Sequence, residues 1–198
     1  MKTEVEIARM RNIIGMAWDF TGMQRVFEKK SGPLVCNLLE KLLDEIEMGP
    51  SNFSHETLCR QIQSSIKTTL GKVPSYGQAA KVVDIAMKVL VGYCRLPNER
   101  IAQIVAPNLH GAIDTPILKR IKEEYKVARG IFTISRIDEV VYAEIQSRLK
   151  ERANQMRCSP IEYDDWLWRK LKDDRAGLSD GKKDAPEDTR NTPHIGER

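Results

Sequence analysis

Hydrophobic positions recur along this chain at intervals of three and four residues, the spacing of amphipathic helices. One apolar stripe with this spacing, at residues 58–70, follows Ser54 and ends at Gly71. No stretch shows the strict alternation that is typical of a half-buried β-strand. The pattern predicts an all-α fold in which about seven helices form one compact domain. The clearest stripe, which Gly49 and Pro50 end, consists of Leu34, Val35, Leu38, Leu39, Leu42, Leu43 and Ile46.

Capping signals predict where several of these helices begin. A serine or aspartate before a helix, with an acid or an amide three residues later, satisfies the first free backbone amides. Asp114 precedes Thr115 and Pro116 and is expected to cap a helix there. Pairs that fit a capping box are Ser75 with Gln78, Ser135 with Asp138, and Ser159 with Glu162.

The segment 76–91 is the most informative of the predicted helices. On a helical wheel at about 100° per residue, its bulky side chains are apolar over about two-thirds of the circumference. Other helices must surround a helix of this kind, so we expect it at the centre of the fold. Its polar residues Gln78, Lys81, Asp84 and Lys88 fall within a single strip about 120° wide.

This polar strip has two interpretations. In the first, Lys81, Asp84 and Lys88 form spaced pairs of opposite charge on the one exposed edge of the helix. In the second, the strip lines a cleft, and a carboxylate between two lysines faces a ligand. The sequence leaves both interpretations open.

Composition divides the chain into two parts. Residues 1–173 carry the helical patterns and form the predicted domain, whereas residues 174–198 are polar, with few bulky apolar side chains, and are expected to be a disordered tail. The tail holds six acidic and five basic residues, so the net charge of +4 for the whole chain leaves +5 on the domain. This mild excess is compatible with a nucleic-acid partner but does not require one.

Targeting and cofactor signals are missing from the sequence. The first six residues are charged and lack an apolar leader core, and no run reaches the length of a membrane span, so we expect a cytoplasmic protein with no membrane contact. Free thiols are expected in that compartment. The sequence has no Cys-x-x-Cys motif among Cys36, Cys59, Cys94 and Cys158. Its three histidines, His55, His110 and His194, lie far apart in the sequence. Neither a metal site nor a cofactor is therefore expected.

A stretch in the middle of the chain resembles the helix-hairpin-helix DNA glycosylases. The likeness covers Val73 to Ile121, about a quarter of the chain, and is carried by Pro74 and Gly77 in a hairpin and by Ile113-Asp114-Thr115 downstream. It implies that the hairpin amides grip a phosphate and that Asp114 helps to expel a damaged base. Ser75 replaces the first hairpin glycine of that family, and Lys81 lies two residues after its lysine position. The chain is also similar to short bacterial helical proteins of no established activity.

Three functional hypotheses follow. In the first, the protein associates with nucleic acid through Ser75, Gly77, Gln78, Lys81 and Lys88. The second is a protein-interaction module that forms a homo-oligomer, with Trp166 packed inward and Trp168 free to anchor a partner. In the third, the protein is a hydrolase of the base-excision type with Asp114 as its acid or base. His110, four residues before Asp114, is expected to be a loop residue because no nucleophile accompanies it.

Overall fold

The computed structural model describes residues 2–27, 30–115, 117–118, 120–121 and 133–180. All regular structure within these residues is helical, so the all-α prediction is confirmed. The α-helices with defined bounds in this part of the chain are α1 (Glu4–Phe20), α2 (Gln24–Phe27), α3 (Ser31–Met48), α4 (His55–Leu70), α5 (Tyr76–Met87), α6 (Glu99–Val105), α8 (Glu139–Gln155) and α9 (Pro160–Asp180).

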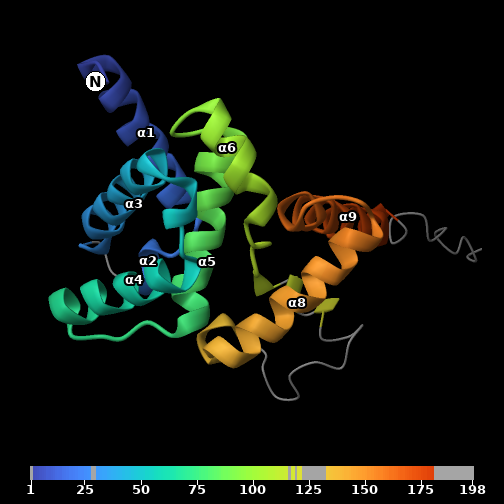
Figure 1. Ribbon diagram of the computed structural model, residues 1–198. Helices are drawn as coiled ribbons and strands as arrows, with labels where there is room; N and C mark the ends of the chain where they lie inside the picture. Colours follow the sequence, from blue (N-terminus) through green and yellow to red (C-terminus); the bar gives the residue numbers. More distant parts are fainter. Residues whose placement is uncertain (1, 28–29, 116, 119, 122–132, 181–198) are drawn as a thin grey trace, which may run out of the picture.

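Helix α5 lies at the centre of the molecule. Figure 1 shows it between the group α1–α4 on one side and the pair α8 and α9 on the other. It packs directly against α1, α4 and α8, and Val82, Val83 and Ala86 have no exposure to solvent. The prediction of an enclosed central helix is therefore confirmed. Ser75 and Gln78 form the predicted capping box at its start.

Gly77, in the first turn of α5, allows a second segment to approach the helix closely. Its amide donates to the carbonyl oxygen of Ile137 at 3.0 Å, and the Ser75 hydroxyl donates to the carbonyl of Ile134 at 3.3 Å. A β-carbon on Gly77 would lie 2.5 Å from the Ile134 carbonyl oxygen. The start of α5 is thus fixed against the 3-10 turn η4 (Ile134–Arg136), which leads into α8.

Two helix boundaries differ from the sequence predictions. The α-helical part of α5 ends at Met87, and the chain continues as a π-helical turn, η2 (Lys88–Tyr93). Ser135 was expected to cap α8, but it lies within η4. Asp138 caps α8 instead, because its carboxylate accepts a hydrogen bond from the Val141 amide at 2.9 Å. The aspartate that seemed to complete a capping box is thus the cap itself.

The C-terminal part of the described chain is the long helix α9. The predicted cap is confirmed, since the Ser159 amide donates to Glu162 Oε2 at 2.7 Å. The helix runs to Asp180 and so passes residue 174, where the sequence suggested that the polar tail begins. Residues 181–198 of that predicted tail lie outside the described residues.

The remaining general expectations concern the thiols and the membrane. All four cysteines are free, as expected. None of the helices in the described part of the chain combines the length and the apolar character that crossing a lipid bilayer requires.

Candidate functional site

The hairpin-like segment before α5 has its amides engaged within the protein. The Ser75 amide donates to Gln78 Oε1 at 2.9 Å, and the Gln78 amide donates to the Ser75 hydroxyl at 3.2 Å. The Gly77 amide is bonded to the Ile137 carbonyl. A phosphate at this segment would have to displace these three bonds. Nucleic-acid binding through Ser75, Gly77 and Gln78 therefore stays a prediction, and the backbone amides of these residues are already engaged within the protein.

The polar strip of α5 is divided between two sides of the helix. Asp84 is 2% exposed and faces α4 and α8, so it is not part of an open edge. Lys88 pairs with Asp164 of α9, its Nζ lying 2.6 Å from Asp164 Oδ2, and it also contacts Asp165. The exposed-edge interpretation is therefore wrong for Asp84, and of the three charged residues Lys81 and Lys88 line a common cavity whose lining does not include Asp84. Helical spacing alone could not show that a neighbouring helix covers this part of the strip.

Lys81, Lys88 and Asp114 line one cavity of about 440 Å³ on the α9 side of α5. The Asp114 carboxylate accepts from the Ile117 amide at 3.0 Å, which confirms its predicted capping role. The hairpin is elsewhere, since Gln78 lines a different and smaller pocket. The structure thus brings together three of the predicted site residues and separates them from Ser75, Gly77 and Gln78.

The ion pair at the base of this cavity is strongly buried. Burial raises the pKa of Asp164 to about 6, although the Lys88 ammonium and the Ala112 amide both favour its charged form. Burial also acts to lower the pKa of Lys88, but the carboxylates of Asp164 and Asp165 raise it above its usual value. Burial therefore acts against the charged form of both partners, and their mutual attraction favours the ionised pair at pH 7.

Exposed aromatic residues surround the same cavity. Phe20 is 66% exposed, Tyr93 is 56% exposed and Trp168 is 43% exposed, and all three line it. Trp166 was expected to pack inward, but it is also 43% exposed and stacks on Tyr163 instead. The prediction that Trp168 anchors a second copy of the chain stays a prediction.

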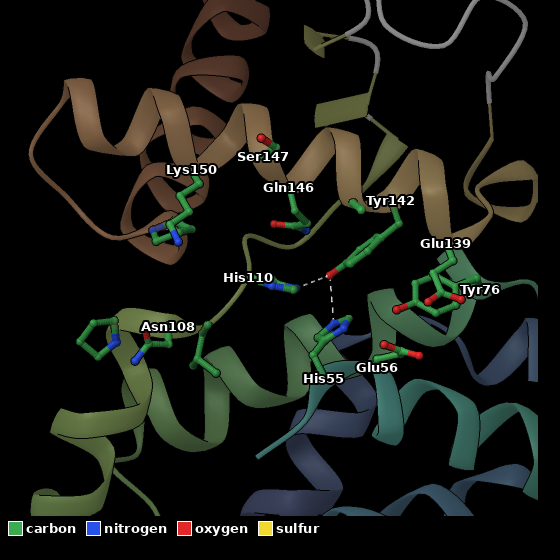
Figure 2. A pocket seen from close by; sticks show the side chains of 14 residues that line it. His55, Glu56, Tyr76, Asn108, His110, Glu139, Tyr142, Gln146, Ser147 and Lys150 are labelled. Carbon is green, nitrogen blue, oxygen red and sulfur yellow. Dashed lines mark hydrogen bonds between the residues drawn. The ribbon is translucent and has the colours of Figure 1, made fainter. Parts of the chain in front are cut away.

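On the opposite side of α5, four polar side chains meet in a compact cluster. Asp84 comes from α5, His55 from the first turn of α4, Tyr142 from α8, and His110 from the segment after α6. The Tyr142 hydroxyl donates to Asp84 Oδ1 at 2.8 Å. His55 Nε2 lies 2.8 Å from the same oxygen and 2.9 Å from the Tyr142 hydroxyl, and His110 Nδ1 is also 2.9 Å from that hydroxyl. Figure 2 shows the two imidazoles converging on the Tyr142 oxygen.

Counting protons shows how this cluster is held together. Tyr142 has one hydroxyl proton, which it gives to Asp84, so its oxygen is left to accept from the ring nitrogens of His55 and His110. Asp84 Oδ1 receives two of these contacts. Asp84 Oδ2, in contrast, is the one buried side-chain oxygen or nitrogen of the described residues that has no hydrogen-bond partner. A buried carboxylate with an unpartnered oxygen is uncommon and calls for an explanation such as an ion or a water.

Burial favours the uncharged forms of Tyr142 and His110. Burial raises the pKa of Tyr142 well above its ordinary value, and the charge of Asp84 adds to this effect. Burial lowers the pKa of His110, although Asp84 acts in the opposite direction. Cys59 Sγ lies 3.6 Å from His55 Nδ1 and 3.9 Å from His55 Nε2. Burial likewise raises the pKa of Cys59, so this sulfur remains a thiol at neutral pH.

The cluster opens into a cavity of about 460 Å³. His55, His110 and Tyr142 are part of its lining, and the walls also carry Gln146 and Lys150 from α8 (Figure 2). The acidic lining residues Glu56 and Glu139 both pair with Arg60. Among the described residues, no carboxylate pairs with Lys150, so its ammonium remains available on the cavity wall.

Sequence reasoning missed this cluster. His55 and His110 were set aside as scattered, yet the structure brings them together with Asp84 so that one ligand atom of each lies within 4.8 Å of the others. The contacts join residues 29 to 87 positions apart, so no local spacing marks them. The one available signal was Asp84, an acid in a helix whose other positions are largely apolar.

Comparison of the chain with protein-family models, with curated proteins and with solved structures finds no match. The candidate site therefore has to be interpreted from its own chemistry.

Proposed function

We propose that the protein is a hydrolase whose active site is the cavity lined by His55, His110 and Tyr142. The observation that carries this proposal is that two imidazoles and a phenol converge at the wall of a cavity large enough for a small molecule, with a buried carboxylate behind them. Burying such groups costs free energy, and sites of this kind are frequently functional. The reaction class agrees with the third sequence hypothesis, but its residues do not include Asp114.

The cluster has the groups that activation of a water molecule requires. Tyr142 fixes the orientation of both rings, and after a change of tautomer the ring nitrogens that now donate to it can accept a proton or hold a polarising ion. Hydrolysis needs a nucleophilic oxygen beside the scissile bond, and the adjacent cavity provides space for that bond.

Lys150 favours an anionic substrate. Its ammonium stands on the cavity wall without a carboxylate partner among the described residues, while Glu56 and Glu139 share the single positive charge of Arg60. A phosphate ester would place its negative charge against Lys150 and its phosphorus near the cluster. We therefore extend the proposal to small phosphate esters.

The proposal predicts measurable hydrolysis of p-nitrophenyl phosphate or bis(p-nitrophenyl) phosphate by the purified full chain. His110→Asn removes a ring nitrogen of the cluster and is expected to lower kcat about 100-fold or more, the usual contribution of a positioned acid–base or ion-holding group. Lys150→Ala is expected mainly to raise KM for these anionic substrates, with a smaller effect on the neutral ester p-nitrophenyl acetate.

Lys81→Met is the matched control, because Lys81 is a half-buried lysine that lines the cavity on the other side of α5. Its activity should equal that of the unmodified protein. Hydrolysis that is unchanged in His110→Asn, or that is absent from the unmodified protein with all three substrates, would count against the proposal.

A further inference from the structure

We infer that His55, Asp84 and His110 form a binding site for a divalent transition-metal ion such as Zn²⁺. The inference deepens the proposed function and rests on it for the role of the cavity, since the ion would be the group that activates water there. Its own evidence is the arrangement of these three side chains.

The distances between the candidate ligand atoms fit a single ion. One ligand atom of each residue lies within 4.8 Å of the other two. An ion about 2.0–2.2 Å from its nitrogen and oxygen ligands, as zinc is, reaches atoms separated by up to about 4.4 Å, and a shift of a few tenths of an ångström in one side chain covers the rest. The ligands come from α4, α5 and the segment after α6, elements that the core holds in place.

The burial and hydrogen bonding of Asp84 also favour a bound cation. Its carboxylate is enclosed, and its Oδ2 has no donor among the described residues. Among the described residues, the polar contacts of this carboxylate are the Tyr142 hydroxyl and the His55 ring, and no lysine or arginine pairs with it. A divalent cation would compensate that charge, and buried charges in proteins are normally paired or coordinate metals.

The residue types select the kind of ion. Two imidazoles and one carboxylate form a mixed nitrogen and oxygen set, which suits zinc, iron or nickel rather than magnesium or calcium. With His55 Nε2 on the ion, His55 Nδ1 would carry the proton and face Cys59 Sγ, a neighbour that fixes the ring. Three protein ligands leave a coordination position open toward the cavity, which is the form that catalytic rather than structural zinc sites take.

Tyr142 would then act as a positioning residue. Its hydroxyl contacts Asp84 Oδ1, His55 Nε2 and His110 Nδ1, so it lies among the ligand atoms. Binding of an ion at the centre requires this hydroxyl to move aside and each ring to carry its proton on its other nitrogen, after which the hydroxyl can still donate to the Asp84 carboxylate. Removing it should therefore weaken metal binding less than removing a ligand does.

The experiment is titration of the chelator-treated full chain with Zn²⁺ by calorimetry and with Co²⁺ by visible absorption. We expect one ion per chain, and cobalt bands of a nitrogen and oxygen ligand field without the intense thiolate charge transfer that cysteine ligation gives. His55→Ala and His110→Ala should each weaken binding about 100-fold or more, because removing a ligand costs at least as much as disturbing its outer partner. Tyr142→Phe should weaken it about 10-fold.

His194→Ala is the matched control, since His194 is the third histidine of the chain and lies outside the described residues. It should bind as the unmodified protein does. Circular dichroism of each variant establishes that it is folded, and Asp84→Asn provides a further ligand variant should one histidine variant not fold. No binding by the unmodified chain, or equal binding by folded His55→Ala and His110→Ala, would overturn the inference.

The two proposals fail separately. Hydrolysis that persists in excess chelator, together with no bound ion, removes the metal site and leaves the hydrolase. Stoichiometric binding that depends on His55 and His110 without any hydrolysis keeps the metal site and removes the proposed function.

Discussion

Replacing Gly77 with alanine is expected to destabilise the protein by about 3 kcal/mol, at the upper end of what overpacking a core costs. The added β-carbon would lie 2.5 Å from the Ile134 carbonyl oxygen and 2.6 Å from the Ile137 β-carbon. The first obstacle is backbone, so it cannot move away as a flexible side chain would. Relief requires η4 to separate from α5, which also breaks the bond from the Gly77 amide to Ile137. Urea denaturation followed by circular dichroism measures the loss.

Gly15→Ala is the control for this prediction. Gly15 is within α1, and a β-carbon there would meet nothing within 4 Å. Alanine in a helix interior is favoured over glycine by about 1 kcal/mol, so this variant should be slightly more stable than the unmodified protein. Equal effects of the two substitutions would mean that the close approach of η4 to α5 is not what makes Gly77 necessary.

Lys88→Met is expected to lower the free energy of unfolding by about 3 kcal/mol at pH 7.5, because it leaves the buried Asp164 carboxylate without its cation. Lys81→Met is the control, since Lys81 lies two turns earlier on α5 and lines the same cavity without an ion pair among the described residues. Its effect should be below about 0.5 kcal/mol. Chemical denaturation of both variants provides the comparison.

The effect of Lys88→Met should also depend on pH. The folded-state pKa of Asp164, about 6, is above its unfolded value, so the folded protein holds this proton more tightly. The contribution of Asp164 to stability is therefore fully present below about pH 4 and declines as the pH rises through 6. At pH 4.5 the carboxyl group is protonated in the folded state and needs no cation, so the Lys88→Met penalty should shrink. A penalty of the same size at both pH values would contradict this account of the pair.

The parts of the fold that follow from local chemistry could be predicted from the sequence. Residues 76–87 are apolar over most of the helix circumference, so this surface can be buried only if other helices pack on several sides of it. In the structure these neighbours are α1, α4 and α8. The caps at Ser75, Asp114 and Ser159 were also predictable, because each depends on side chains within three residues of the helix start.

The candidate site could not be predicted in the same way. Its geometry depends on which turn of α4 and which turn of α8 meet Asp84, and helical periodicity carries no information about the alignment of separate helices. The strip containing Lys81, Asp84 and Lys88 looked continuous on a wheel. In the folded chain the approach of His55 and Tyr142 encloses Asp84 and leaves Lys81 at a cavity on the other side.

The enclosure of α5 has a consequence for how this sequence can vary. Ala79, Ala80 and Ala86 have no exposed surface, so even one added methyl group at these positions would press on a neighbouring helix. Gln78, Lys81 and Ile85 are the positions between 78 and 87 with some access to solvent. Random mutagenesis of α5 should therefore recover folded variants chiefly at those three positions. In natural sequences we expect substitutions to accumulate there and to be rare at the enclosed positions of the helix.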